Sequence, residues 1–315
     1  MNYGVTALGE ILIDFTTYGT SENGMALFEQ NPGGAPANVL VALQNLGIKT
    51  AFIGKVGDDT QGYFLKETLE KYKVDTKGLV IDKNFFTTLA FVSLKNGERE
   101  FAFARKPGAD TQLRKEEVNI EIIKNSKIFH FGSLSLTDEP SRSATLFAIS
   151  EAKKNNILIS YDPNYRALLW NSKENAIEKM RSVIKYVDIM KISDEETELL
   201  TDEKNSSKAG QILLNQGVSC VVITLGENGA IFKTKDFEIK LKGKERKVVD
   251  TTGAGDSFWG AILYKFLNSN KKPCEITKKE GYEFLKFANI VAGLCVEKRG
   301  AIPALPKLED VLKEL

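Results

Sequence analysis

Cysteine and histidine are scarce in this 315-residue sequence. The three cysteines, Cys220, Cys274 and Cys295, are far apart and form no CxxC pair. We therefore expect no disulfide framework and no zinc site, and a reducing cytoplasm fits this pattern best. The single histidine, His130, excludes a multi-histidine metal site. It lies in an apolar run typical of a buried strand, so we interpret it as a structural residue. A Ser-His-Asp catalytic triad is possible only if His130 is its histidine.

Excess charge of one sign and long apolar runs are also lacking. The 43 Lys and Arg residues nearly balance the 42 Asp and Glu residues, for a net charge of +1. Without a basic stripe, nucleic acid and membrane surfaces are not expected partners. The N-terminus has no basic leader, and no segment is apolar for long enough to span a bilayer. Neither the dinucleotide motif G-x-G-x-x-G nor the P-loop motif occurs, which argues against both kinds of site.

Short β-branched runs alternate with longer amphipathic stretches along most of the chain. Such alternation predicts an α/β fold with a doubly wound, mostly parallel sheet and helices on both faces, formed by a single domain over residues 1–315. Strands are expected at residues 5–8, 50–56, 128–131, 158–161, 189–192 and 220–225. Helices are expected at residues 35–46, 62–71, 141–155, 177–186, 206–216, 255–266 and 279–297. Sheets of this kind bind ligands at the carboxyl ends of their strands.

Two segments, at about 15–30 and 86–107, interrupt this alternation because neither contains a good helix. The second alternates apolar and polar residues around Asn96-Gly97, which is a strong hairpin signal. Together they predict a discontinuous small β-sheet that acts as a lid over a site. The alternative is an ordinary β-excursion with no part in function.

A glycine loop, Asp250-Thr-Thr-Gly-Ala-Gly-Asp256, leads into an amphipathic helix. The N-terminus of a helix after such a loop presents N–H groups and the positive end of the helix dipole, which together suit an anion. Asp256, at the start of the helix, could accept a proton from a hydroxyl that attacks phosphorus. The alternative is a first-turn acid or N-cap with no catalytic role.

A second glycine loop, Gly33-Gly-Ala-Pro-Ala-Asn38, also opens a helix. Gly33 and Gly34 would let a substrate lie against bare backbone. Asn38, in the first turn, offers both a donor and an acceptor, which suits a polyol.

Taken together, these two loops resemble the N- and C-terminal signatures of the PfkB, or ribokinase-like, family of carbohydrate kinases, and the resemblance extends from Gly9 to Pro303. It implies ATP-dependent transfer of the γ-phosphoryl group to a sugar hydroxyl, on a doubly wound α/β fold with a small β-lid. It also implies that Asp256 is the catalytic base. The resemblance gives Gly253, Ala254 and Gly255 as the anion hole, and Asp14, Gly33, Gly34 and Asn38 as sugar ligands.

The resemblance also implies a nucleotide side. The turn Thr224-Leu-Gly-Glu-Asn-Gly229 looks like the one that holds ATP, with Gly226 and Gly229 as its glycines, and Asn289 lies where the family contacts adenine. Glu196 stands where the family organises Mg²⁺ through water, although Ser193 replaces the Asn of the family's Asn-x-x-Glu motif. Asp250 and Thr252 match a monovalent cation site, so K⁺ joins ATP and Mg²⁺ among the implied ligands. Backbone groups implied near that cation site are those of Cys295, Lys298, Gly300 and Ala304.

Three stretches resemble the fructokinase branch of the family: residues 101–110, 128–142 and 160–170. Arg105 ends a predicted lid strand and Arg166 follows a predicted strand, so both could reach a hydroxylated substrate or the phosphoryl group. Either arginine could instead pair with an acid at the surface. The rival is a 2-keto-3-deoxygluconate kinase, whose substrate carries a carboxylate, and a non-catalytic sugar or nucleotide sensor is a remote alternative. We expect MgATP and a sugar as partners, and a homodimer through the lid.

Overall fold

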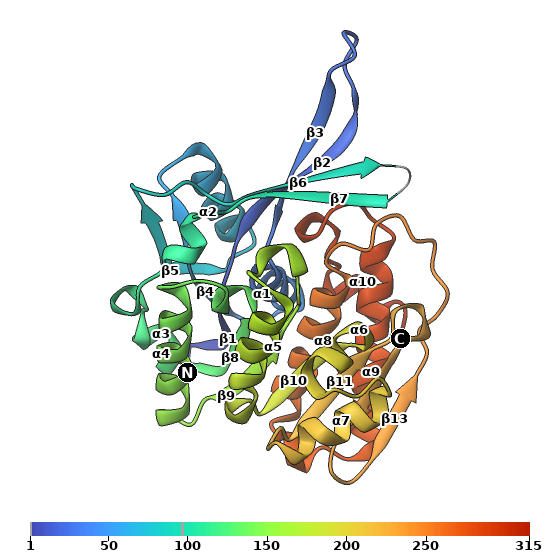
Figure 1. The fold of residues 1–315 in the computed structure, drawn as a ribbon. Coiled ribbons are helices and arrows are strands. Elements are labelled where there is room, and N and C mark those ends of the chain that lie inside the picture. Colours follow the sequence, from blue (N-terminus) through green and yellow to red (C-terminus); the bar gives the residue numbers. More distant parts are fainter. Residues whose placement is uncertain (1, 96–97) are drawn as a thin grey trace.

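The computed structural model describes residues 2–95 and 98–315, and it describes their side chains outside residues 93–101. Within these residues a nine-stranded sheet forms the centre of the molecule, in the order β13-β12-β11-β10-β9-β8-β1-β4-β5 (Figure 1). Its strands are β1 (Tyr3–Leu8), β4 (Thr50–Gly57), β5 (Asp75–Asp82), β8 (Ser126–Gly132), β9 (Leu158–Asp162), β10 (Ile189–Ser193), β11 (Cys220–Thr224), β12 (Ala230–Lys233) and β13 (Glu238–Leu241).

Most of this sheet is parallel, as the sequence predicts. β1 pairs in parallel with both β4 and β8, so that Leu8 is opposite Ile53 on one side and Phe131 on the other. After β1 the chain adds β4 and β5 on one side of it, and later adds β8 to β11 in order on the other side. Strands β12 and β13 follow β11 and pair antiparallel. The carboxyl ends of β1 and β8 to β11 therefore meet at one edge, next to the point where the direction of winding reverses. Ligand sites of such sheets lie there.

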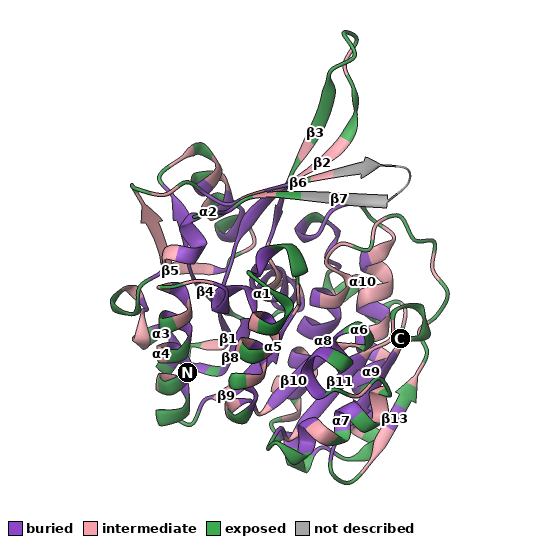
Figure 2. Cartoon of the chain, viewed as in Figure 1, coloured by how far each residue is buried: buried purple, intermediate pink, exposed green. Residues whose placement is uncertain are grey.

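Helices cover both faces of the sheet (Figure 1). They are α1 (Ala35–Asn45), α2 (Thr60–Lys71), α3 (Ile120–Lys124), α4 (Ser141–Lys154), α5 (Lys173–Ser182), α6 (Asp194–Thr201), α7 (Ser206–Asn215), α8 (Ala254–Ser269), α9 (Lys278–Val296) and α10 (Leu308–Leu312). One core contains the apolar faces of α1, α2, α8 and α9, and a second contains those of α3, α4, α5 and α7. The central strands β4 and β8 to β11 are almost wholly buried (Figure 2), which explains their nearly continuous apolar sequences, whereas the edge strands β5 and β13 are partly exposed.

A smaller sheet stands off the main one (Figure 1). Its strands are β2 (Leu12–Thr20), β3 (Ala26–Gly33), β6 (Leu89–Lys95) and β7 (Glu98–Ala104), in the order β3-β2-β6-β7. The two discontinuous segments thus combine into one sheet, joined by the parallel pairing of β2 with β6. The predicted Asn96-Gly97 turn lies outside the described residues. Phe91 stacks on Phe15 and meets Phe28 edge-on, while Tyr18 and Met25 are exposed, so apolar side chains remain on this sheet's surface.

Several element boundaries differ from those expected. The helix expected at residues 177–186 begins at Lys173, because the Ser172 hydroxyl caps it by accepting from the Asn175 N–H, and it ends at Ser182. Strands β12 and β13 were not predicted, since four residues are too few for a periodic signal. His130 is buried within β8, and all three cysteines are free, both as predicted. No helix among the described residues is long and apolar enough to cross a membrane.

Candidate active site

The glycine loop at residues 250–256 ends on the first turn of α8. Gly253 is the N-cap residue and has a φ of 77°, a left-handed conformation that glycine adopts without strain. A Cβ there would also lie 3.1 Å from Ala301 Cα. No side chain caps the helix, and Ala254 N–H donates to the Thr251 carbonyl at 3.2 Å. The loop therefore presents the start of a sixteen-residue helix to whatever lies beside Asp256, as an anion site requires.

Asp256 is buried and held by two asparagine side chains. Asn38 Nδ2 donates to its Oδ2 at 2.7 Å, and Asn164 Nδ2 donates to its Oδ1 at 3.4 Å. Burial raises the pKa of Asp256 above its usual value, while the Lys191 ammonium, the Asn38 hydrogen bond and Arg166 oppose that rise. A buried carboxylate with a raised pKa, held at a helix N-terminus, has the character of a general base.

The second glycine loop lies against Asp256 through Asn38, whose Oδ1 is buried and accepts no hydrogen bond from the described residues. Asp14, on β2, lies directly beside the loop, because a Cβ added at Gly33 would collide with its Oδ2. Gly34 has a φ of 113°, and a Cβ there would lie 2.5 Å from the Glu10 carbonyl oxygen, so it too admits no side chain. The four predicted sugar ligands Asp14, Gly33, Gly34 and Asn38 thus lie together.

The charge of Asp14 is coupled to the same site. Burial raises its pKa to about 6, Arg166 opposes the rise, and Asp256 and Asp250 add to it. Arg166 therefore lies close enough to act on both Asp14 and Asp256. Its guanidinium is exposed and donates to the Tyr165 carbonyl at 3.0 Å. The structure thus places Arg166 at the rim of the site, free to turn toward a ligand.

Arg105, which follows β7, is paired within the protein and acts on the charge of Glu10 beside the first glycine loop. Its guanidinium is buried, and its Nε donates to Asp110 Oδ2 at 2.8 Å. The other two nitrogens donate to Thr137 Oγ1 and to the Leu134 carbonyl. Each nitrogen of Arg105 therefore already has a partner within the protein. These bonds tie the end of β7 to the segments that contain Asp110 and Leu134. A sugar contact by Arg105 stays a prediction.

Residues of the predicted nucleotide side follow the ends of β10 and β11. Glu196 Oε2 accepts from the Ser193 N–H at 2.8 Å, and its Oε1 accepts from the Tyr165 N–H at 2.7 Å. Thr224 ends β11, and the turn after it has left-handed glycines at Gly226 and Gly229. A Cβ at Gly226 would meet nothing within 4 Å, so a ligand can approach that backbone.

Asn289, the predicted adenine contact, lies on α9. Its Nδ2 donates to the Leu241 carbonyl at 3.2 Å, at the end of β13. Gly243 follows in the same loop, and a Cβ there would lie 3.7 Å from the Asn289 side chain. Asn289 therefore borders the loop that leads back to the glycine-rich turn at residues 250–256.

Asp250 organises the predicted cation loop. Its Oδ1 accepts from the N–H and the hydroxyl of Thr252 at 2.9 and 2.7 Å. Its Oδ2 accepts from the Gly300 N–H at 3.0 Å, and Cys295 Sγ lies 3.9 Å from the Thr252 carbonyl. Of the residues named for a monovalent cation, Thr252 and Gly300 are thus held by the Asp250 carboxylate, and Cys295 lies beside them.

A buried ion pair in the site escaped the sequence reasoning. Lys191 Nζ, on β10, donates to Asp162 Oδ2, at the end of β9, over 2.8 Å. The signal was present, because Lys191 interrupts an apolar strand and Asp162 opens the motif Asp162-Pro-Asn164, whose Asn164 reaches Asp256. Neither residue type is usually buried unless paired, so a lysine inside a strand pattern is informative.

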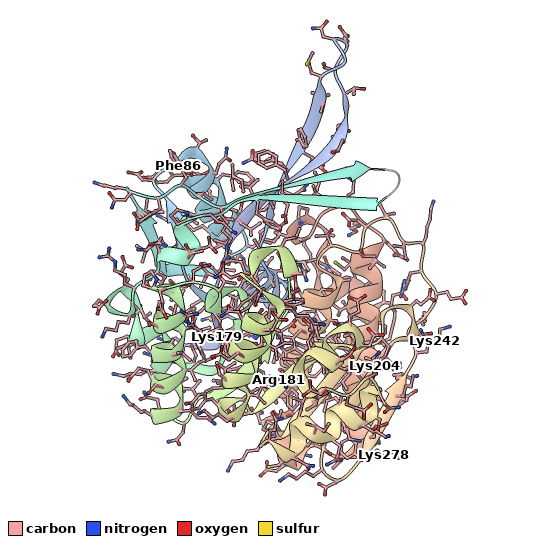
Figure 3. The ribbon with its side chains drawn as sticks, in the orientation of Figure 1. Phe86, Lys179, Arg181, Lys204, Lys242 and Lys278 are labelled. Atoms are coloured by element: carbon pink, nitrogen blue, oxygen red, sulfur yellow. The ribbon has the colours of Figure 1, made fainter. Side chains whose placement is uncertain are left out.

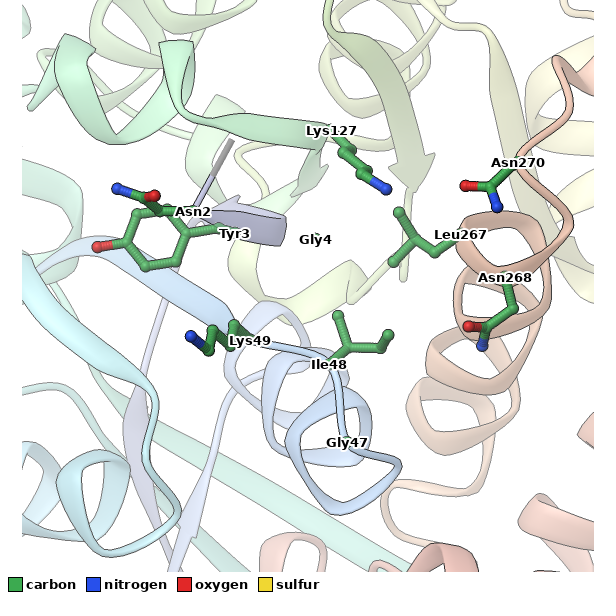
Figure 4. Close-up of a pocket in the computed structure, with 10 residues that line it drawn as sticks. All are labelled: Asn2, Tyr3, Gly4, Gly47, Ile48, Lys49, Lys127, Leu267, Asn268 and Asn270. Carbon is green, nitrogen blue, oxygen red and sulfur yellow. The ribbon is translucent and has the colours of Figure 1, made fainter.

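A separate cavity of about 280 Å³ lies at the opposite edge of the sheet (Figure 4). It is lined by residues near the start of β1, including Gly4, by Ile48 and Lys49 before β4, and by the end of α8. None of the predicted site residues lines it. The chemistry-bearing side chains gather instead at the carboxyl edge of the strands.

Comparison with known proteins agrees with this geometry. The model of the pfkB family of carbohydrate kinases matches residues 4–308. Probable fructokinase-5 of Arabidopsis thaliana is 45% identical over 315 residues, covering 98% of this chain and 96% of the relative. The solved structure of a fructokinase from Xylella fastidiosa with bound ATP has a TM-score of 0.92 at 30% identity, covering 99% of this chain and 98% of its own.

A fructokinase double mutant from Vibrio cholerae, solved with fructose, ADP and a potassium ion bound, has a TM-score of 0.89 at 30% identity, with 99% and 98% covered. The family match spans nearly the whole sequence, and the structural likeness includes both sheets. The chain therefore belongs to the pfkB family of carbohydrate kinases.

Proposed function

We propose that this protein is a fructokinase, which transfers the γ-phosphoryl group of ATP to the 6-hydroxyl of D-fructose. The observation that carries this proposal is the meeting of the two glycine loops. Asn38 of the first loop holds the carboxylate of Asp256, which stands at the helix N-terminus opened by the second. A hydroxyl bound by the first loop would then lie beside a base and an anion site at once.

In the proposed reaction, fructose binds among Asp14, Gly33, Gly34 and Asn38. Asp256 accepts the proton of the attacking hydroxyl, whose oxygen forms a bond to the γ-phosphorus as the bond to the ADP oxygen breaks. N–H groups of Gly253 to Asp256 stabilise the charge on the transferring group. The small sheet acts as the lid that excludes water, so that ATP is not hydrolysed in place of sugar phosphorylation.

ATP would lie along the turn from Thr224 to Gly229, with its base near Asn289. Both oxygens of the buried Glu196 accept backbone N–H groups, and each keeps a further acceptor position for water. Mg²⁺ usually retains several waters and is held by one or two carboxylates with substrate phosphates, so Glu196 fits a Mg²⁺ reached through water. The metal, when bound, neutralises phosphate charge. Asp250 and Thr252 would hold K⁺ beside the anion site.

Fructose is favoured over 2-keto-3-deoxygluconate by the fructokinase relatives, and the pairing of Arg105 is consistent with a neutral sugar. An acid sugar needs a cation for its carboxylate; Arg105 is already paired with Asp110 at 2.7 Å and buried, so that role would fall to Arg166 at the rim of the site. A neutral ketose needs no such partner.

We also propose that two chains associate through their small sheets. The exposed apolar residues there, Tyr18, Met25, Leu27, Phe28 and Phe91, would be covered by a second copy. The three free thiols fit a cytoplasmic location. Light scattering of the Phe28→Asp variant tests the dimer, which should shift toward monomer if this sheet is the interface.

The substrate assignment is tested by measuring ADP release with MgATP against fructose, 2-keto-3-deoxygluconate, ribose, glucose and a nucleoside. We expect strong turnover on fructose, with a phosphorylated product that carries the phosphate on the 6-hydroxyl. Preferred turnover of another sugar would support the kinase activity and refute the assignment of fructose as the substrate. Binding of a sugar or ATP with no turnover on any member of the panel would favour a sensor instead.

A further inference from the structure

Lys191 carries the only ammonium among the described residues that is buried beside Asp256. We propose that Lys191 is a catalytic residue: its ammonium contacts the transferring phosphoryl group and neutralises its charge from the sheet side, opposite the N-terminus of α8. This rests on the proposed kinase reaction. Neither glycine loop contains Lys191, and it adds to the site a formal positive charge that backbone N–H groups lack.

The position of Lys191 supports this role directly. A Cβ added at Gly255 would lie 3.2 Å from Lys191 Nζ, so the ammonium lies against the first turn of α8. Gly255 has no side chain to separate the two. The ammonium thus adjoins the same loop whose N–H groups face the anion, and it acts on the charge of Asp256 across that loop.

Lys191 keeps its proton in this environment. Burial lowers its pKa, but the carboxylates of Asp162, Glu196 and Asp256 outweigh burial and raise the pKa above its usual value. Burial also raises the pKa of Asp162, to about 7. A bound MgATP would add further negative charge to this site, and a fixed cation at this point reduces its repulsion by the surrounding carboxylates.

The pair with Asp162 is not fully satisfied within the protein. Asp162 Oδ2 accepts from Lys191, while its Oδ1 is buried and accepts no hydrogen bond from the described residues. A buried ion pair stabilises a fold only when its remaining polar positions are also satisfied. Lys55, by contrast, is equally buried but contacts two carboxylates, Asp82 at 2.9 Å and Glu117 at 2.7 Å. Lys191 Nζ donates to one carboxylate among the described residues, so two of its three N–H groups are left for phosphoryl oxygens, whereas Lys55 is held between two carboxylates.

During transfer Lys191 exchanges no proton. The proton of the sugar hydroxyl goes to Asp256, the new bond forms between that oxygen and phosphorus, and the leaving oxygen departs with ADP. Lys191 interacts more strongly with the transferring group than with the bound reactants, because charge spreads over the equatorial oxygens in the transition state. Asp162 is a positioning residue that holds the ammonium in place.

The test uses Lys191→Met, the double variant Lys191→Met/Asp162→Asn, and Lys55→Met as a matched control for losing a buried ammonium. The double variant removes the uncompensated Asp162 charge and so restores the thermal stability that the single variant loses. We measure kcat on the sugar that the wild-type enzyme turns over, and the affinities for MgADP and for MgADP with aluminium fluoride, a mimic of the transferring phosphoryl group.

We expect both Lys191 variants to lose at least about 100-fold in kcat and a similar factor in aluminium fluoride affinity, with MgADP affinity changed less than about threefold. Lys55→Met should lose stability and keep kcat. Recovery of kcat in the double variant, or an equal loss of MgADP and aluminium fluoride affinity, would overturn the proposal. Absence of wild-type turnover on every sugar would instead refute the kinase function itself.

Discussion

Asn38 and Asp256 are separated by 218 residues, yet Asn38 Nδ2 donates to Asp256 Oδ2 over 2.7 Å. The bond joins the start of α1 to the start of α8, and so joins the proposed sugar loop to the proposed anion loop. It also stabilises the ionised form of a buried carboxylate, which is the form a base needs. This contact fixes the geometry on which the proposed reaction depends.

The pH dependence of kcat should report the ionisation of Asp256. Burial raises its pKa, so activity should fall, as pH decreases, at a higher pH than an ordinary aspartate would give. Asn38→Leu removes a hydrogen bond that lowers this pKa, so the acid limb should move to higher pH and kcat should fall about 10- to 100-fold. An acid limb at the same pH in the Asn38→Leu variant would contradict the proposal that this hydrogen bond lowers the pKa of Asp256. Asp14→Asn is the control, because burial raises the pKa of Asp14 to about 6, so that its ionisation could also shape the acid limb.

Gly33→Ala should weaken sugar binding selectively. The added methyl group would collide with Asp14 Oδ2, so the carboxylate must leave its position beside the loop. We expect the KM for fructose to rise at least about tenfold and the KM for ATP to change little, as steady-state kinetics with each substrate varied would show. Gly210→Ala, on α7, is a control for replacing a glycine, because its φ is not positive and a Cβ there would meet only the flexible Lys233 side chain at 3.0 Å and Ile223 Cδ1 at 3.4 Å. Equal rises in both KM values would argue against a sugar-specific loop.

Arg299 links the C-terminal part of the chain to the small sheet. Its guanidinium lies 3.4 Å from Glu29 Oε2, donates to the Thr17 carbonyl at 3.2 Å and lies over the Tyr18 ring. Arg299→Ala should loosen the lid, raising both the KM for fructose and the ATP hydrolysis seen without sugar by about three- to tenfold.

Arg181→Ala is the matched control for Arg299→Ala. Arg181 makes a two-pronged contact with Asp202 on the surface, away from the small sheet (Figure 3). Each variant thus loses an arginine that pairs with a carboxylate and donates to a backbone carbonyl, and only Arg299 contacts the small sheet. Identical kinetics of the two variants would show that the contacts of Arg299 with the small sheet do not control closure of the lid.

Replacing K⁺ in the assay by tetramethylammonium should lower kcat at least about fivefold, because the proposed cation beside the anion loop would be lost. Asp250→Asn should abolish this dependence, since Asp250 organises the loop through Thr252 and Gly300. The measurement is turnover at constant ionic strength over a K⁺ titration. A flat titration in the wild-type enzyme would contradict the cation site.

The sequence predicted the parts of the fold that rest on repeated local signals. The helix expected at residues 279–297 is found at Lys278–Val296, and the strand expected at residues 189–192 is found at Ile189–Ser193. Both have apolar periodicity and sharp ends; Thr277, for example, caps α9. The parallel pairing of β2 with β6, by contrast, joins segments about 75 residues apart and has no local signal.

The site was predictable where glycine marks a loop before a helix, because such loops have a conformational cause in the sequence. A lysine inside an apolar strand signals that Lys191 is buried and paired, but the sequence does not show that its partner is Asp162, since that depends on the adjacent register of β9 and β10. The sequence left open whether Arg105 contacts the substrate or pairs with an acid. Its Nε donates to Asp110, five residues later, and a sugar contact by Arg105 stays a prediction.

The most direct test of the account is the phosphoryl transfer of Asp256→Asn in a single turnover with fructose and MgATP. Asparagine keeps the size of the side chain and can still contact Asn38, but it accepts no proton. The account predicts a loss of at least about 1,000-fold in the rate of fructose phosphorylation, with fructose and ATP affinities and melting temperature nearly unchanged. A rate within about tenfold of the wild-type enzyme would show that Asp256 is not the base and would contradict the account.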